Sequence, residues 1–85
     1  MFYVYILKSL KDGDIYTGYS SNLKARVKRH NDGLVKSTKS RRPLKLIYYQ
    51  AFLSKKDAVK EELYLKSGGK AKNSLKLRIK SSLDI

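Results

Sequence analysis

Tyr3-Val4-Tyr5-Ile6-Leu7, followed after a short polar segment by Ile15-Tyr16-Thr17-Gly18-Tyr19, is the part of the chain from which its architecture is best predicted. Both runs are aromatic and β-branched, which suits a pleated, half-buried surface. Asp12-Gly13 between them is a strong hairpin signal. Every residue from Phe2 to Leu7 is apolar or aromatic, so the first strand is predicted to lie centrally in a small sheet.

Side chains alternate between the two faces of a strand, and this alternation places several candidate reactive residues on the same face. Tyr3, Tyr5 and Leu7 share one side of the first strand, and Tyr16 and Gly18 share one side of the second. If the register joins these sides, two phenols meet beside a bare glycine backbone. Glycine packs nothing inside a strand, so Gly18 indicates a bulge or a close approach by a ligand. A titratable hydroxyl where a phosphate can reach the main chain suits phosphodiester chemistry.

A helix is predicted after the hairpin, capped by Ser21 or Asn22 and ended by Gly33. Arg26 and His30 are four residues apart, so they are neighbours on one helix face beside the apolar stripe. An arginine fork can hold two phosphate oxygens, and a histidine can donate or shuttle a proton. The alternative is a solvated basic face. The inward positions are expected to be Leu23, Val27 and Leu34.

The next segment predicts a third strand and a second helix. Pro43 opens the strand Leu44–Phe52, in which Tyr48 and Tyr49 point to opposite faces and are both assigned to packing. The spacing of Ser54 and Asp57 is that of a capping box. In the helix that follows, an apolar arc is expected to hold Ala58, Val59, Leu63 and Leu65.

Glu62 falls near the middle of that arc, whereas Glu61 lies at its margin. A carboxylate in an apolar stripe needs a partner. Mg²⁺ is one, since it takes one or two carboxylates and fills its other positions with water and phosphate oxygens. An internal ion pair with a lysine or arginine is the alternative. Ser67-Gly68-Gly69 ends the helix, and residues 70–83 are predicted to form a last, basic amphipathic helix.

Composition narrows the class of protein. The 85 residues make one domain, and 20 Lys and Arg against seven acids give a formal charge of +13, which favours a polyanionic partner. The absence of cysteine excludes disulfides and thiol chemistry. No basic leader with an apolar core and no run of about 20 apolar residues is present, so a cytoplasmic location is expected.

Basic residues are densest between Lys24 and Lys45, where nine Lys or Arg accompany one acid, Asp32. This segment is expected to grip phosphate and sugar oxygens, with a merely solvated loop as the alternative. The residues predicted to bind nucleic acid are Gly18, Lys24, Lys28, Arg29, Lys36, Lys39, Arg41, Arg42, Lys70 and Lys72.

Four motifs in order over residues 2–66 make the chain resemble the GIY-YIG nucleases, in particular their small stand-alone bacterial type. They are Tyr3-Val4-Tyr5 as a degenerate first motif, Tyr16-Thr17-Gly18 as the second, the helix Asn22–His30, and Ala58 with Glu62 followed by Tyr64-Leu65-Lys66. The resemblance implies an α/β fold: a small, three-stranded, mainly antiparallel sheet flanked by helices, forming a single domain over residues 1–85.

The resemblance also implies a metal-dependent endonuclease that hydrolyses phosphodiester bonds in DNA, in repair or processing. Tyr5 or Tyr16 would be the general base, directly or through the other. Arg26 would clamp the scissile phosphate, His30 would assist proton transfer, and Glu62 would hold one Mg²⁺ or Mn²⁺.

Other functions are compatible with the same sequence. The chain is also compatible with a nucleic-acid-binding module that has lost catalysis, or with a basic protein of the ribosome or nucleoid. RNA and branched DNA are alternative partners, and a monomer is expected. Many family members carry an asparagine near the site, for which Asn73 is the candidate here. Tyr3 and Tyr19 are assigned to packing.

Overall fold

The fold is described from a computed structural model over residues 1–84. Its centre is a three-stranded antiparallel sheet in the order β2-β1-β3, formed by β1 (Phe2–Ser9), β2 (Ile15–Ser20) and β3 (Leu44–Phe52). The predicted α/β architecture is therefore confirmed, including the hairpin and the central place of the first strand.

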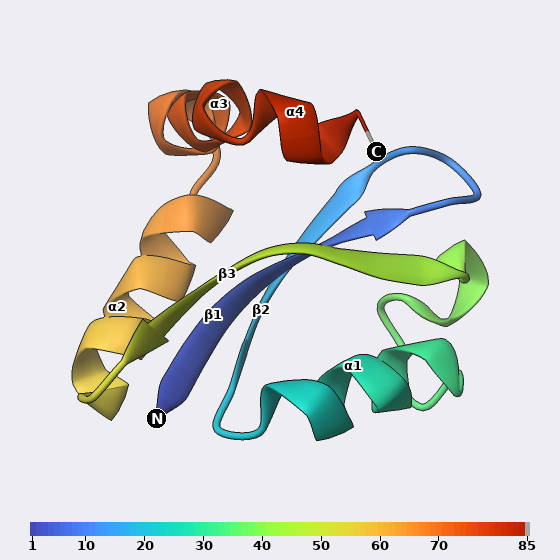
Figure 1. Ribbon diagram of the computed structural model, residues 1–85, viewed down its shortest axis with the longest axis horizontal. Helices are drawn as coiled ribbons and strands as arrows, with labels where there is room; N and C mark the ends of the chain where they lie inside the picture. Colours follow the sequence, from blue (N-terminus) through green and yellow to red (C-terminus); the bar gives the residue numbers. More distant parts are fainter. Residues whose placement is uncertain (85) are drawn as a thin grey trace.

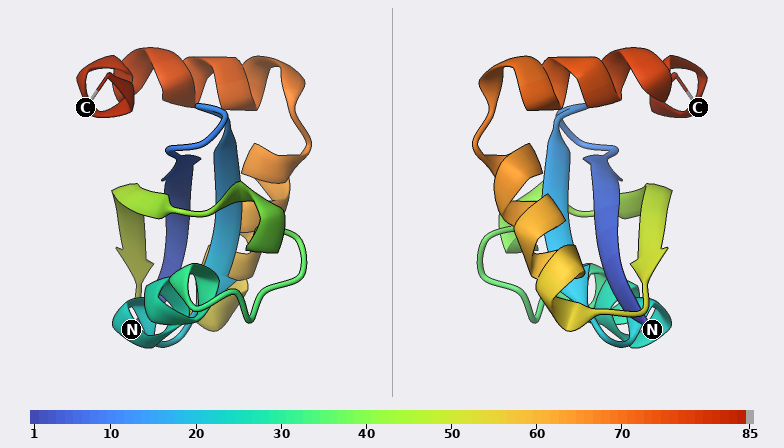
Figure 2. Two further views of the ribbon diagram at one scale, coloured as in Figure 1. Left: turned by 90° about the vertical axis from the view of Figure 1, so that its right-hand side faces the viewer. Right: turned by 90° about the vertical axis from the view of Figure 1, so that its left-hand side faces the viewer.

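Helices cover both faces of this sheet (Figures 1 and 2). The first helix packs on one face, and the second packs on the other, joined by the C-terminal helices at one end of the sheet. A short 3-10 turn, η1, lies in the connection that leads to β3. The helical elements are α1 (Leu23–Asn31), η1 (Lys39–Arg41), α2 (Lys55–Lys66), α3 (Gly69–Arg78) and α4 (Lys80–Leu83).

The two sides of β1 belong to two different cores. Val4 and Ile6 pack under α2 and the C-terminal helices, whereas Tyr5 and Leu7 pack under α1. All four side chains are fully buried, as expected for a strand without an exposed face. A central strand buried on both sides holds Tyr5 in a fixed position.

The register of the hairpin places Tyr5 opposite Gly18 and Leu7 opposite Tyr16, so the two phenols share one face. The sequence predicted a bulge or a close approach by a ligand at Gly18, but the pairing is continuous there and the Tyr5 ring occupies the space. A Cβ built on Gly18 would lie 2.3 Å from both Cζ and Oη of Tyr5. Gly18 is buried beneath the phenol, which corrects its assignment as a nucleic-acid contact.

Three side chains expected to pack inward are exposed. Leu34 is 59 % exposed because α1 ends at Asn31, and His30 takes the inward-facing position that follows Leu23 and Val27. Leu63 is 61 % exposed because the stripe that α2 turns inward runs from Ala58 to Leu65 and leaves Leu63 on the outer side. Tyr49, assigned to packing, is 54 % exposed.

The C-terminal segment forms two helices where one was predicted. Ile79, with φ −112° and ψ 24°, separates α3 from α4, so the direction of the chain changes there. The apolar side of this segment is nonetheless inside, because Leu75 and Ile79 are buried and Leu83 packs against the same core. The break after Ser67 and the caps of α1 and α2 by Asn22 and Ser54 agree with the sequence.

Replacing Gly18 by alanine is expected to destabilise the protein by about 1–3 kcal/mol, because the new methyl group overlaps a buried ring that has no room to move. Urea unfolding measures the change. The cost should shrink in a Tyr5→Leu background, where the outer part of the ring is gone. An equal cost in both backgrounds would show that the Tyr5 contact is not the cause.

Candidate active site

A chain of hydrogen bonds joins the hairpin to α1 and to the connection beyond it. The hydroxyl of Tyr5 lies 2.8 Å from Nε2 of His30, and Nδ1 of His30 lies 2.7 Å from Oγ1 of Thr38. All three side chains are fully buried. A tyrosine of the hairpin and the histidine of α1 thus lie together, and a threonine extends the pair.

The protonation of this chain follows from its burial. Burial raises the pKa of Tyr5, and the nearby charges of Tyr16 and Glu62 raise it further, while the Arg26 guanidinium beside the phenol acts in the opposite direction. Burial and the charge of Arg26 lower the pKa of His30 to about 4. At neutral pH the phenol is therefore protonated and the imidazole is neutral.

A neutral imidazole has one N–H donor and one acceptor nitrogen, so its two hydrogen bonds must run in one direction. Either Tyr5 donates to Nε2 while Nδ1–H donates to Thr38, or Thr38 donates to Nδ1 while Nε2–H donates to Tyr5. In the first arrangement the histidine is ready to take the proton of the phenol. The direction of the hydrogen bond between Thr38 and Nδ1 is thus tied to whether Nε2, the nitrogen that faces Tyr5, carries the proton.

Tyr16 packs against both members of this pair and also reaches the surface. Its ring centroid lies 6.4 Å from that of Tyr5 and 5.1 Å from that of His30, and its side chain is partly exposed. Nζ of Lys66 lies 5.6 Å from the centre of the Tyr16 ring. A hollow of about 220 Å³ beside Tyr16 is also lined by Lys66 and Lys72, which makes it attractive to an anion.

Arg26 is placed beside the Tyr5 phenol by its position on α1, one turn before His30. Its Nε is buried, and among residues 1–84 it has no hydrogen-bond partner. Buried donors are normally paired, so an unpaired one at a cluster of polar groups is suited to an acceptor that arrives with a ligand. A phosphate oxygen is an acceptor of that kind.

Glu62 comes from α2, on the far face of the sheet, and its charge reaches Tyr5. Its side chain is 17 % exposed and forms an ion pair with Lys66, in which Oε2 of Glu62 lies 3.2 Å from Nζ of Lys66. The ion pair that the sequence left open as an alternative is therefore formed. Within residues 1–84, no three carboxylate or imidazole side chains gather into a metal site. One carboxylate still fits Mg²⁺, which keeps much of its water shell.

The basic residues predicted to bind nucleic acid do not form one group. Lys28 is paired with Asp32 at 2.7 Å, and Arg41 with Asp12 at 3.3 Å, so both have acidic partners within the chain. Lys39 and Arg42 line a second hollow, together with Lys11. The others, Lys24, Arg29, Lys36 and Lys70, are exposed, and Lys72 is half-buried beside Tyr16. Asn73 is exposed on α3.

Two residues of the candidate active site, Thr38 and Lys66, were not predicted from the sequence. Thr38 lies in the basic connection, where its neighbours suggested a loop that contacts solvent, and nothing local indicates that its hydroxyl is buried against His30. Lys66 could have been found, because it stands four residues after Glu62, the spacing of a helical ion pair.

Comparison with known proteins identifies the domain to which this chain belongs. The profile of the GIY-YIG catalytic domain matches residues 1–80, and the chain belongs to the GIY-YIG family. Within it, the chain is similar to the UPF0213 proteins. One from Clostridium perfringens is 44 % identical over 86 residues, covering 100 % of this chain and 88 % of the relative.

Two further relatives extend this comparison. A UPF0213 protein of Staphylococcus haemolyticus is 47 % identical over 66 residues, covering 76 % of this chain and 79 % of the relative. The solution NMR structure of a UPF0213 protein from Bacillus halodurans matches with a TM-score of 0.57 and 38 % identity, covering 94 % of this chain and 86 % of that one. The GIY-YIG family is a family of nucleases.

None of the helices within residues 1–84 is long and apolar enough to span a bilayer.

His30 is the sole histidine of the chain, so its titration can be followed directly by NMR. Its ring resonances should shift with a midpoint near pH 4 in the folded protein and near about 6.5 in urea. Because the unfolded chain binds this proton more tightly, folding stability should fall as the pH is lowered from about 6.5 towards 4. A folded-state midpoint near 6.5 would contradict the burial of the imidazole.

Thr38→Val removes the hydroxyl with little change of shape and leaves Nδ1 of His30 without its partner. We expect a loss of about 1–3 kcal/mol in the free energy of unfolding, because a buried polar atom becomes unsatisfied. Thr38→Ser should recover most of it. Ring ¹⁵N shifts should report Nδ1–H in the wild type and a change in the valine variant. Equal stability of both variants would sink the role given to Thr38.

Proposed function

We propose that this protein is a metal-dependent endonuclease that hydrolyses phosphodiester bonds in DNA. Membership of a nuclease family supports the reaction class. The observation that carries the proposal is the convergence on Tyr5: the phenol is hydrogen-bonded to His30, and the charges of Arg26 and Glu62, from helices on opposite faces of the sheet, both act on it. Polar groups from distant parts of the chain rarely share one buried point without a task.

The proton path begins at Tyr5. In the arrangement in which Tyr5 donates to Nε2 of His30, the hydroxyl passes its proton to that nitrogen as its oxygen takes a proton from the water that attacks phosphorus. When Nδ1–H of His30 donates to Thr38, Nε2 is the acceptor that this transfer needs. Tyr16, which touches both rings and reaches the surface, forms the side from which the water enters.

The phosphate is held by Arg26, whose unpaired Nε is ready for one of its oxygens and whose charge stabilises the extra negative charge of the transition state. Glu62 would hold Mg²⁺ or Mn²⁺, which neutralises the leaving oxygen when it is bound. Lys66 then has to leave Glu62, and the substrate phosphates offer it another anionic partner. The basic surface supplies general affinity for DNA, in keeping with the charge of +13.

A second candidate function is a nucleic-acid-binding module without catalysis. The ion pair between Lys66 and Glu62 favours it, because a carboxylate already neutralised by a lysine is a poorer metal ligand. The complete burial of Tyr5 favours it as well. Labelled single-stranded, duplex and branched DNA, each incubated with Mg²⁺, Mn²⁺ or EDTA, distinguishes the two functions, since only the nuclease converts substrate to product.

Glu62→Ala is expected to lower the rate of metal-dependent cleavage by about 100-fold or more, because a metal ion contributes several kcal/mol to such transition states. Binding of DNA in EDTA should stay within about two-fold of the wild type, because the basic surface is unchanged. Cleavage rates on labelled DNA and fluorescence anisotropy measure the two effects.

Glu61→Ala is the matched control, since it removes the same charge from the neighbouring, partly buried position of α2. It should leave the cleavage rate close to that of the wild type. Equal turnover by the wild type and Glu62→Ala would refute the assignment, and so would equal losses in the two variants.

A further inference from the structure

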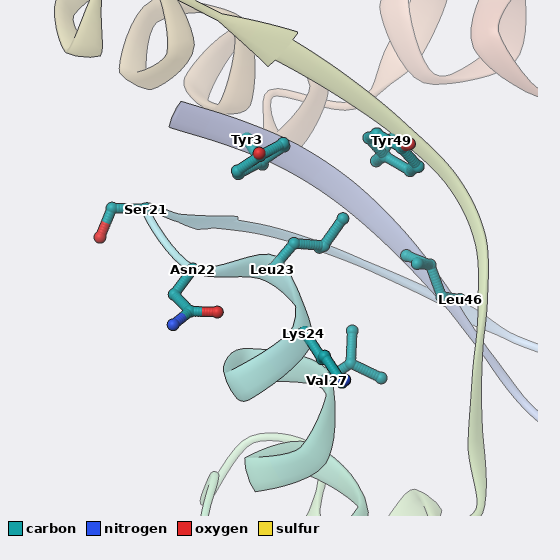
Figure 3. Close-up of a pocket in the computed structure, with 8 residues that line it drawn as sticks. All are labelled: Tyr3, Ser21, Asn22, Leu23, Lys24, Val27, Leu46 and Tyr49. Atoms are coloured by element: carbon teal, nitrogen blue, oxygen red, sulfur yellow. The ribbon is translucent and has the colours of Figure 1, made fainter. Parts of the chain in front are cut away.

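An open groove separate from the candidate active site runs between α1 and the strands β1 and β3 (Figure 3). Its volume is about 530 Å³, and its floor and walls are mostly apolar. The rings of Tyr3 and Tyr49 lie on the strand side, and aliphatic side chains of α1 face them across the gap. The lining residues are Tyr3, Ser21, Asn22, Leu23, Lys24, Val27, Leu46 and Tyr49.

The groove and the candidate active site lie on opposite flanks of α1. Lys24 lines the groove and Arg26 lies beside Tyr5, and two residues along a helix are about 200° apart around its axis. Tyr3, at the groove, is two residues from Tyr5 on the same face of β1, a distance of about 7 Å along the strand. The groove and Tyr5 are therefore close to each other along β1, on either side of α1.

The groove offers a flat aromatic surface to a ligand. Tyr49 is 54 % exposed, and its ring meets that of Tyr3 edge to face, with centroids 6.0 Å apart at 67°. More than half of Tyr49 is therefore open to a ligand. An exposed aromatic ring at the mouth of an apolar groove is the kind of platform on which unpaired bases stack.

Charge selects among the ligands that an apolar groove could take. Its lining contains one cation, Lys24, and no acid, in a chain of net charge +13, so a ligand that carries negative charge is favoured. Asn22 accepts a hydrogen bond from the Ala25 amide through Oδ1, which leaves its Nδ2 as a donor at the rim. The groove therefore suits a ligand with a flat apolar part, a negative charge beside it and hydrogen-bond acceptors at its edge. A nucleotide has these three properties, and a peptide fits them less well.

We infer that this groove binds an unpaired nucleotide of the DNA substrate, with the base stacked on Tyr49 and its phosphate beside Lys24. The inference rests on the proposed function for the identity of the polymer and deepens it, since it gives the protein a preference for DNA with a single-stranded or extruded base. A fully paired duplex keeps its bases stacked on one another and cannot fill the groove.

Anisotropy titrations in EDTA test this without any need for cleavage. The probes are a labelled oligothymidylate of ten nucleotides and a blunt duplex of the same length. Tyr49→Leu should weaken binding of the oligothymidylate roughly five-fold to a hundred-fold, while Tyr49→Phe, which keeps the ring, should bind as the wild type does. Duplex affinity should be equal in the wild type and both Tyr49 variants, because it depends on the basic surface.

Tyr64→Leu is the matched control, because Tyr64 is 58 % exposed on α2 and does not line the groove. It should change neither affinity. Lys24→Gln should lower the salt dependence of oligothymidylate binding by roughly 0.7 in the log–log slope, the effect of one phosphate contact.

Unchanged affinity of Tyr49→Leu for the oligothymidylate would overturn the inference and leave the groove to another class of ligand, such as an apolar peptide. Equal losses with the oligothymidylate and the duplex would also overturn it. The proposed nuclease function fails separately, through absence of metal-dependent cleavage, and such a result leaves the binding measurements valid.

Discussion

The hydrogen bond between Tyr5 and His30 is the interaction on which the rest of the structure depends. It joins the central strand to α1 inside one of the two cores, and it can form only because Gly18 leaves the space that the phenol fills. A polar pair in the core is costly unless every group is satisfied. Thr38 completes it, so a residue of the basic connection is tied to the centre of the fold.

That connection is held at several further points, which explains how an irregular segment can position a buried hydroxyl. Asn31 pairs with both backbone groups of Leu44, through Nδ2 at 2.9 Å and Oδ1 at 2.8 Å. Ser9 donates to the carbonyl of Arg41, and Arg41 reaches Asp12. The turn after β1 and the segment before β3 are thus fastened together. The basic character of this segment and its structural role therefore coexist, and charge alone is a poor guide to which of its residues are free to bind a ligand.

The sequence predicted most of the fold because its signals were local. Strand periodicity around Tyr5, the caps at Asn22 and Ser54, and the break after Ser67 each follow from residues within one turn or one hairpin. The residues assigned to the site also followed from spacing and from the family motifs, and the structure places Tyr5, Tyr16, Arg26 and His30 together, with the charge of Glu62 acting on the same phenol. The failures were long-range. Three features depend on which elements pack against each other: Thr38 is buried, Leu63 is exposed, and the Tyr5 ring fills the space at Gly18. The periodicity within one element carries no information about such contacts.

The complete burial of Tyr5, His30 and Thr38 has a consequence for how such a protein can evolve. The residues that would carry the reaction also hold the interior together. A substitution at these positions would therefore reduce both activity and stability. Selection is left with the rim, where Tyr49, Lys24 and the lysines of α3 can be exchanged at little cost to folding. A lineage built on this scaffold would diversify in what it recognises long before it changed what it does.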